Sequence, residues 1–329
     1  MELSNIIFSL FLIFFGYFFN KYILLIFKKT KSNLLTDKQF QKIQAFHENS
    51  TYRLSGVIIF SLLALVYLYL SLVRNIFFYE YVSFCTLFFL LGLVDDLKIN
   101  IAPKFRLLIM IMFLITLVIS NEINIKRTGL EFLDNLIAID IFSLIFICLC
   151  FLFIINGSNL IDGFNGLLGI HSLIIFIVLF AINLINENNN LMYFLFYVSL
   201  LTLIFLKFNF PKAQIFLGDS GAYLIGILIA ISVIKTSNLN PSISPFFFCI
   251  LLFYVFFEVF FSFFRKLFVV RLNPLLPDNQ HLHMLFYKVL LKKNNTKLAS
   301  NYAVSIYINL IYLSLIIPGI VFMNNGLFC

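Results

Sequence analysis

Charged residues are scarce in this chain: they make up 12% of its 329 residues, whereas hydrophobic residues make up 62%. So little charge cannot cover a soluble globule, and several apolar stretches of about 20 residues have the length of membrane-spanning helices. The composition therefore excludes a soluble domain. It predicts an all-α, polytopic membrane helix bundle of about ten or eleven transmembrane helices, with 1–329 as a single integral membrane domain.

The apolar stretches predict ten spans, with boundaries uncertain by about 2–4 residues. They lie near 3–27, 54–73, 77–94, 107–120, 136–155, 167–185, 191–206, 221–235, 245–264 and 302–323.

Other features are missing as well. The five cysteines show neither disulfide nor metal-site spacing, which favours packing roles. The first apolar stretch lacks a basic leading region and a small-residue cleavage site, so we expect it to remain as a span. No internal repeat is evident. The net charge of +8 comes without a nucleic-acid-reading motif, so anionic lipid or a phosphorylated substrate is a better match for it than nucleic acid.

Most lysines and arginines fall in alternate loops, which predicts an orientation with both termini outside. Only Arg74, Lys126, Arg127 and Lys235 would face outside, and Lys21 lies within the first span. The inner loops hold Lys28, Lys29, Lys31, Lys38, Lys42, Arg53, Lys98, Lys104, Arg106, Lys207, Lys212, Arg265, Lys266, Arg271, Lys288, Lys292, Lys293 and Lys297.

Four polar islands fall on that same inner face, and the first is the pair Asp95 and Asp96 at the end of the third span. Two adjacent carboxylates at a membrane edge are costly unless water, a cation or a basic partner compensates them. A solvated helix end is the plainer interpretation. Lys98, Lys104 and Arg106 follow closely and could hold a phosphate that the acids and a divalent ion also engage.

The second island is the richest in polar side chains. Asn156, Asn159, Asp162 and Asn165 recur every three residues and would form one stripe on a helix, with glycines between them that let a ligand approach the backbone. A polar connector between two spans is the alternative. Ordinary connectors do not need this regular spacing, so the stripe favours ligand binding.

The third island runs from Asn209 to Asp219, where Asp219 begins a helix. Asp219 would serve there as an N-cap, or as a carboxylate ligand of Mg²⁺. Phe216 could stack on a base, although a single phenylalanine usually contributes to packing.

The fourth island contains His281 and His283, whose spacing places them on opposite sides of a regular helix. A zinc pair is therefore disfavoured, and contact with phosphate or a plain loop role remains. Glu258, inside the ninth span, is expected to reach toward Arg265 or Ser262.

In this order, the islands resemble the polyprenyl-phosphate N-acetylhexosamine-1-phosphate transferase family. The resemblance covers most of the chain, including the segments 42–47 and 53–56 as well as the islands. It implies a helix bundle in a bacterial inner membrane whose cytoplasmic cleft binds a UDP-N-acetylhexosamine, a polyprenyl phosphate and Mg²⁺, with Mn²⁺ as a substitute. A homodimer is compatible with it.

The resemblance also implies roles for individual residues. Asp219 looks like the metal ligand, and Asp95 and Asp96 look like the acidic pair near the lipid phosphate. His281 and His283 look like a phosphate-contacting loop, and together these five form the predicted catalytic set. Asn159, Asp162, Asn165, Asn209 and Phe216 look like the nucleotide pocket. The predicted substrate-binding set also contains Asn156, and Lys104 and Arg106 as phosphate clamps.

Three departures from the family pattern are visible. Ile99 stands where a third acid is common, Asn165 where many members have Asp, and Met284 where a third histidine is common. Asparagine can still pair with a uracil edge. The reduced histidine motif argues against the muramoyl-pentapeptide branch and leaves the sugar open.

The expected reaction is attack of a lipid phosphate oxygen on the β-phosphorus of the UDP-sugar, which releases UMP at the start of a cell-envelope glycan. Direct attack, with Asp95 or Asp96 removing a residual proton, is favoured over a covalent intermediate. Two alternatives stay open: a transporter for a phosphorylated or nucleotide solute, and an inactive family member.

Overall fold

A computed structural model describes residues 3–30, 35–37, 51–99, 101–271, 280–293 and 296–326, and these are almost entirely helical. Two two-residue strands, β1 (Thr36–Asp37) and β2 (Thr51–Tyr52), pair antiparallel. The long helices are α1 (Leu3–Thr30), α2 (Ser55–Arg74), α3 (Tyr79–Asp96), α4 (Pro103–Ser120), α6 (Asp140–Ile161), α7 (Leu167–Ile185), α8 (Asn189–Asn209), α9 (Gly218–Leu239) and α13 (Lys297–Val321). The shorter ones are α5 (Glu131–Ile137), α10 (Pro245–Leu251), α11 (Phe253–Phe264), the π-helical η1 (Arg265–Val270) and α12 (Leu282–Lys292).

Eight of these helices are long and apolar enough to cross a membrane, which confirms the predicted all-α polytopic bundle. α10 and the helix that follows it would form a ninth span, although they are bent by 68° where they meet. α3 has the same length as α4, but Glu80, Asp95 and Asp96 at its ends make it more polar. Each predicted span thus corresponds to a helix, and the ninth is broken.

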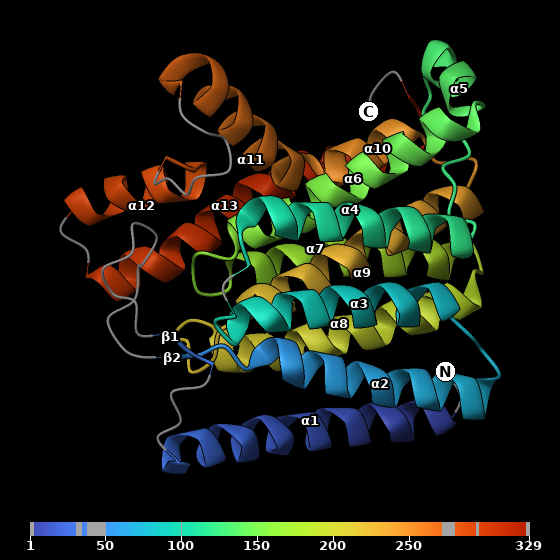
Figure 1. Cartoon of the computed structure of the whole chain (residues 1–329). Coiled ribbons are helices and arrows are strands. Elements are labelled where there is room, and N and C mark those ends of the chain that lie inside the picture. Colours follow the sequence, from blue (N-terminus) through green and yellow to red (C-terminus); the bar gives the residue numbers. More distant parts are fainter. Residues whose placement is uncertain are drawn as a thin grey trace.

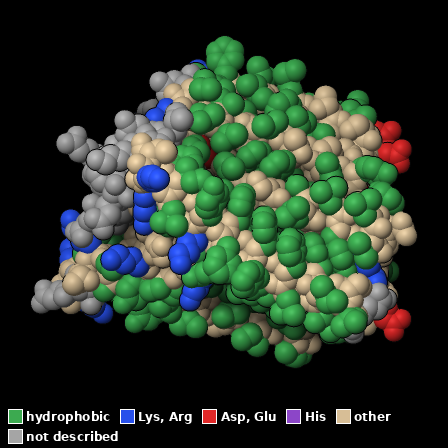
Figure 2. Space-filling model, turned by 90° about the horizontal axis from the view of Figure 1, so that it is seen from below, with side chains coloured by type: hydrophobic (Ala, Val, Ile, Leu, Met, Phe, Trp, Pro, Cys, Tyr) green, Lys and Arg blue, Asp and Glu red, His purple; other side chains and the backbone are tan. Residues whose placement is uncertain are grey.

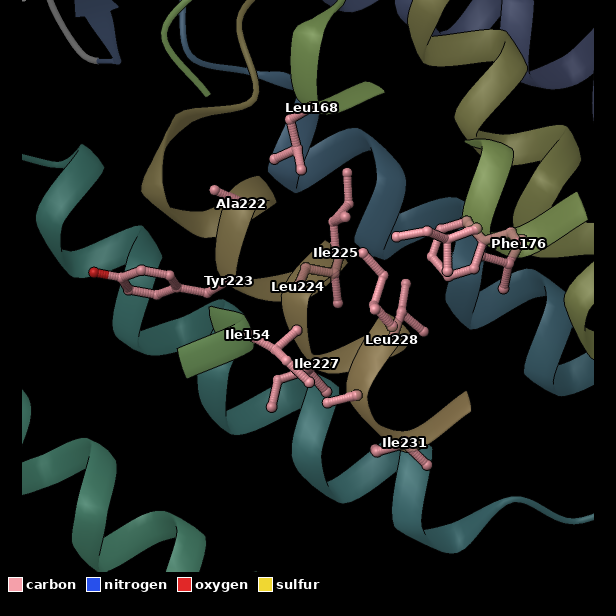
Figure 3. Close-up of a cluster of buried hydrophobic side chains, with 14 of the residues drawn as sticks. Ile154, Leu168, Phe176, Ala222, Tyr223, Leu224, Ile225, Ile227, Leu228 and Ile231 are labelled. Atoms are coloured by element: carbon pink, nitrogen blue, oxygen red, sulfur yellow. The ribbon is translucent and has the colours of Figure 1, made fainter. Parts of the chain in front are cut away.

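The long helices run side by side and reverse direction from one to the next (Figure 1). α9 is central, and every residue from Ser220 to Val233 is buried. Its aliphatic side chains pack with Ile154 of α6 and with Leu168 and Phe176 of α7 (Figure 3). Because its residues are buried on all sides, other helices rather than lipid surround it, and α9 forms the core on which the bundle is built.

Small residues allow α2 and α3 to approach the first turn of α9. A Cβ added to Gly92 would lie 2.5 Å from the Ser220 Cα atom, and one added to Gly56 would lie 2.5 Å from the Gly221 nitrogen. Side chains larger than glycine would therefore separate these helices. Close approach over small residues is a common basis of helix packing in membranes.

Polar side chains also join helices within the apolar interior. Tyr81 of α3 pairs with Ser232 of α9, and Asn183 of α7 donates to Thr236 of α9. Since lipid offers no alternative partner, such hydrogen bonds are worth about 1 kcal/mol each.

Charge is distributed unevenly between the two ends of the bundle. Figure 2 shows lysines and arginines gathered at one end, acidic side chains at the other, and apolar side chains between them. The basic end is the one at which α1 and α8 finish with Lys28, Lys29 and Lys207. The chain termini lie at the opposite end (Figure 1). This asymmetry agrees with the uneven distribution of lysines and arginines among the loops of the sequence.

Candidate active site

All four polar islands, as far as the structure describes them, lie at the basic end of the bundle (Figure 1). Asp95 and Asp96 end α3, the second island ends α6 and leads into α7, Asp219 begins α9, and His281 and His283 begin α12. Since neighbouring helices alternate in direction, helix ends that are far apart in the sequence meet here. The segment 42–47 lies outside the described residues.

Asp96 is bound to the first turn of α9. Its carboxylate accepts hydrogen bonds from the Asp219 backbone nitrogen at 3.0 Å, from the Ser220 backbone nitrogen at 2.9 Å and from the Ser220 hydroxyl at 2.6 Å. Arg53 contacts the same carboxylate at 3.4 Å. A carboxylate at a helix N-terminus satisfies orphan N–H groups and complements the helix dipole, so Asp96 caps α9 from a neighbouring helix.

The cap depends on a glycine that lies directly beneath it. Gly218 has a φ of +71° and begins α9, and a Cβ added there would lie 2.6 Å from both carboxylate oxygens of Asp96. A side chain would displace the carboxylate, and a positive φ is costly for any residue other than glycine. The Phe216–Asp219 segment is held further by the backbone of Tyr52, Ser55 and Gly56.

Asp95 and Arg106 form an ion pair across the α3–α4 connection. Arg106 donates to the Asp95 carboxylate at 2.8 Å, and both side chains keep partial contact with solvent. The predicted proximity of Arg106 to the acidic pair is therefore present. Lys104, two residues earlier in α4, is exposed.

Asp219 and Asp162 complete a group of four carboxylates. Burial raises the pKa of Asp162 well above its usual value; Arg53 opposes this effect, whereas Asp219 and Asp96 add to it. These mutual influences place the α3, α6–α7 and α9 acids in one electrostatic environment. Within the described residues, neither the Asp219 nor the Asp162 carboxylate accepts a hydrogen bond, whereas those of Asp95 and Asp96 do. Burial favours the neutral form of Asp162, so the half-buried Asp219 carboxylate is the better placed of the two to take a cation.

The asparagines of the second and third islands are bonded largely to backbone. Asn165 donates its side-chain amide to the Pro211 carbonyl at 2.9 Å. Asn209 accepts from the Gly166 nitrogen at 2.6 Å and donates to the Ile215 carbonyl at 2.9 Å. Asn301 of α13 accepts from the Asn165 nitrogen at 2.9 Å. These amides hold the α6–α7 and α8–α9 loops together.

The remaining predicted substrate-binding residues of the islands are Asn156, Asn159 and Phe216. Asn156 donates to the Leu152 carbonyl within its own helix, and Asn159, one turn later, is half-buried. The Phe216 side chain is half-buried, while its backbone pairs with Tyr52. The structure places these residues at the same end of the bundle and leaves their binding role a prediction.

His281 and His283 both contact one buried carboxylate. Nδ1 of His281 lies 3.0 Å and Nδ1 of His283 lies 3.2 Å from Glu258 of α11. The prediction that the two imidazoles face opposite sides was wrong. His281 is the extended residue that precedes α12, with ψ of 151°, so its ring stacks parallel to that of His283.

Sequence reasoning missed three contributors to this end of the bundle. Glu258 was expected to reach toward Arg265 or Ser262 and instead bonds to both histidines. Ser220 and Asn301 join the site through contacts with Asp96 and Asn165. A carboxylate inside an apolar span was the available signal for Glu258; no local signal marked the other two.

Among the described residues, no three His, Cys, Asp or Glu side chains converge as a metal-binding group. Mg²⁺ is usually bound through one or two carboxylates, with substrate phosphates and water as the other ligands. A single accessible carboxylate such as that of Asp219 would be compatible with that pattern. The donor set therefore suits Mg²⁺ better than zinc, which prefers a closed set of protein ligands.

The sequence pattern of glycosyl transferase family 4 matches residues 78–237, which contain three of the four islands. A Thermotoga maritima protein named undecaprenyl-phosphate alpha-N-acetylglucosaminyl 1-phosphate transferase is 29% identical over 60% of this chain and 58% of its own length. A Dictyoglomus thermophilum phospho-N-acetylmuramoyl-pentapeptide-transferase is 32% identical over 59% of this chain and 65% of its own.

A third relative, from Bacillus subtilis, carries the name probable undecaprenyl-phosphate N-acetylglucosaminyl 1-phosphate transferase. It is 28% identical over 59% of this chain and 53% of its own length. In all three comparisons the match spans less than two thirds of the relative.

Proposed function

Because the chain belongs to glycosyl transferase family 4, we propose that it transfers an N-acetylhexosamine 1-phosphate from a UDP-sugar to a polyprenyl phosphate. N-acetylglucosamine is the first candidate for the sugar, since the Thermotoga maritima relative is named for it and Met284 stands where a third histidine would favour the muramoyl-pentapeptide branch. The acceptor would lie in the bilayer of a bacterial cytoplasmic membrane, and the basic end would face the cytoplasm. The product would begin a cell-envelope glycan.

The observation that carries this proposal is the clustering of opposite charges at one end of an apolar bundle. Four carboxylates from three connections lie among Arg53, Arg106 and the His281–His283 pair. A water-soluble donor reaches this end from the aqueous phase, and a lipid phosphate reaches it from the headgroup layer. Phosphoryl transfer depends mainly on positioning and on neutralising charge, and this cluster supplies groups for both.

In the proposed reaction, a bond forms between the lipid phosphate and the β-phosphate of the UDP-sugar, and the bond between its α- and β-phosphates breaks. An oxygen of the lipid phosphate attacks the β-phosphorus of the UDP-sugar, the bond from that phosphorus to the bridging oxygen breaks, and UMP leaves with the electron pair. The lipid then carries a diphosphate linked to the sugar. At neutral pH the attacking phosphate is already anionic, so only a residual proton needs an acceptor.

Individual roles follow from the contacts of each side chain. Asp219 would hold Mg²⁺, which when bound neutralises diphosphate charge. Arg106 and Lys104 would contact phosphate oxygens. Asp95, which is more accessible than Asp96, would take the residual proton, since Asp96 already accepts three hydrogen bonds from α9.

Purified protein incubated with undecaprenyl phosphate, Mg²⁺ and a panel of UDP-sugars tests the proposal, with UMP release as the readout. The panel should include the muramoyl-pentapeptide donor. We expect UMP release with a UDP-N-acetylhexosamine. Absence of release with every donor would contradict the proposal, and uptake of a nucleotide sugar into vesicles without cleavage would indicate a transporter.

Asp219→Asn tests the assignment of Asp219 as the metal ligand. It removes one charge and should lower the rate by about 10²–10³, while the fold remains because no hydrogen bond among the described residues depends on the Asp219 carboxylate. Asp140→Asn removes the same charge from an exposed position at the opposite end and should leave the rate unchanged. Near-normal turnover by Asp219→Asn would refute its assignment as metal ligand.

A further inference from the structure

Glu258 is a buried carboxylate to which the proposed reaction gives no role. It lies in α11, is 0% exposed, and belongs to none of the four polar islands. An ionised side chain inside an apolar helix is costly unless it is paired. Its two oxygens are each bound to a different imidazole: Oε2 to Nδ1 of His281 at 3.0 Å, and Oε1 to Nδ1 of His283 at 3.2 Å.

The local backbone explains how one carboxylate reaches two histidines that are two residues apart. His281 precedes α12 in an extended conformation, and His283 lies in the first turn of the helix. The rings therefore face the same way, with centroids 5.4 Å apart and planes inclined by 3°. In this arrangement the two Nδ1 atoms reach the two oxygens of one carboxylate.

This contact determines which ring nitrogen carries the hydrogen. A carboxylate at neutral pH can only accept, so each Nδ1 that faces Glu258 must be an N–H donor. An unprotonated Nδ1 would instead set its lone pair against a carboxylate oxygen. With the hydrogen on Nδ1 of His283, the Tyr254 hydroxyl oxygen 3.2 Å away can only accept from that nitrogen.

The opposite edge of His283 is directed at the proposed site. Its Nε2 atom is buried and has no hydrogen-bond partner among the residues that the structure describes. A Cβ added to Gly163 would lie 3.7 Å from that atom, and the Phe164 ring meets the imidazole edge-on with centroids 5.6 Å apart. Gly163 and Phe164 connect α6 to α7, between Asp162 and Asn165. A buried nitrogen without a partner beside this loop is placed to meet a ligand.

We propose that Glu258 is a positioning residue that fixes the tautomer and orientation of His281 and His283, so that His283 offers Nε2 to a phosphate oxygen of the nucleotide sugar. This inference rests on the function proposed above. Burial lowers the pKa of His283, and the charge of Glu258 opposes this effect. The charge of a bound phosphate would add to that of Glu258, and the imidazolium that then forms donates Nε2–H to a phosphate oxygen. The arrangement resembles the carboxylate–histidine pairs that orient imidazoles in metal sites and catalytic triads.

Two substitutions of Glu258 separate the effect of its charge from the effect of its side-chain length. Glu258→Gln keeps one accepting oxygen, so it can hold only one of the two imidazoles, and we expect kcat/KM to fall roughly 10–100-fold. Glu258→Asp keeps the charge on a shorter side chain and should restore part of the loss. Glu80→Gln is the matched control, because it breaks a carboxylate–cation pair with Lys235 at the opposite end. We expect it to leave kcat/KM within about twofold.

A double-mutant cycle separates positioning from general damage to the fold. If Glu258 acts through the histidines, Glu258→Gln added to His281→Ala/His283→Ala should lower kcat/KM by less than about twofold further. A full additional loss in that background would overturn the proposal. So would a loss in the single variant no larger than that of Glu80→Gln.

Nitrogen-15 NMR of histidine-labelled protein in detergent tests the tautomers without any reaction. The chain has four histidines, and single His→Gln variants assign their signals. We expect Nδ1–H in the wild-type signals of both His281 and His283, and a change in at least one of them in Glu258→Gln. Nε2–H with unprotonated Nδ1 in the wild type would refute the inference. If no UDP-sugar is turned over, the proposed function fails, and this measurement still decides whether Glu258 orients the pair.

Discussion

Asp96 and Ser220 tie the end of α3 to the beginning of α9 through two hydrogen bonds to one carboxylate oxygen. Oδ2 of Asp96 accepts from the Ser220 nitrogen at 2.9 Å and from its hydroxyl at 2.6 Å. The neighbouring residue in each helix, Asp95 or Asp219, is a carboxylate of the proposed site. The contact that holds the two helices together therefore also sets the distance between two functional groups.

Asp96→Asn should destabilise the protein more than Ser220→Ala. The amide replaces an accepting oxygen by a donor and leaves a buried N–H of α9 unpaired, which costs about 1–3 kcal/mol. Ser220→Ala removes one hydroxyl donor and retains both backbone donors, so its cost should be about 0.5–1.5 kcal/mol. Thermal unfolding in detergent measures both. Asp95→Asn is the control, because it breaks the Arg106 pair and leaves the cap intact; a larger loss there would contradict the capping role.

Gly92→Ala should separate α3 from α9 and lower both stability and transfer. The new Cβ would lie 2.5 Å from the Ser220 Cα atom, which is backbone and cannot rotate away, and overpacking of this kind costs about 1–3 kcal/mol. Gly319→Ala adds the same methyl group where the nearest atom is 3.5 Å away. That control should keep its unfolding temperature. Equal tolerance of both substitutions would show that α3 and α9 do not pack this closely.

Asp162→Asn should stabilise the protein at neutral pH. Burial raises the pKa of Asp162 well above 3.8, and the charges of Asp219 and Asp96 raise it further against the influence of Arg53. Between the ordinary and the raised value the folded state binds more protons than the unfolded state, so stability falls as the pH rises through that window. The asparagine variant does not lose stability over this pH range. Its advantage in stability over the wild type should therefore disappear as the pH falls to the ordinary pKa of 3.8.

Unfolding temperatures measured across this pH range test the Asp162 prediction. Glu187→Gln removes an exposed carboxylate at the opposite end and should show no comparable change with pH. A variant Asp162→Asn that is less stable than the wild type at neutral pH would mean that a compensated carboxylate is required there.

The basic end should face the cytoplasm. Lys98→Cys and Lys212→Cys place thiols at exposed positions of this end, and Glu131→Cys places one at the other end. In a background without the native cysteines, a membrane-impermeant thiol reagent should label Glu131→Cys in intact cells. It should label the other two in inverted membranes only. Labelling of Lys98→Cys or Lys212→Cys from outside would reverse the orientation.

Asn165→Ala should weaken binding of the UDP-sugar. The substitution removes the bond to the Pro211 carbonyl that joins two loops, as well as any pairing with uracil, for a cost of roughly 1–3 kcal/mol. The base is remote from the reacting phosphorus, so the loss should appear mainly in KM. An unchanged KM, or equal use of an ADP-sugar, would contradict a uracil pocket at this position.

Much of the architecture followed from the sequence alone, because hydrophobic length and the distribution of charge are local properties. Apolar stretches predicted the helices that the structure contains, and alternation of their direction predicted that Asp95, Asp162, Asp219 and His283 share one end. The broken ninth span was not anticipated, since the bend at Leu252 has no proline or glycine within it.

The partner of each polar side chain was decided only by the tertiary structure. The sequence predicted Asp96 and Asn209 as site residues and could not show that Asp96 caps α9 or that Asn209 bonds to two loops. It also could not show that Glu258 holds both histidines. A hydrogen bond depends on positions within a few tenths of an ångström, and those positions come from helices packed across more than a hundred residues of chain. Composition and spacing specify which residues reach one end of the bundle; packing specifies which atoms meet there.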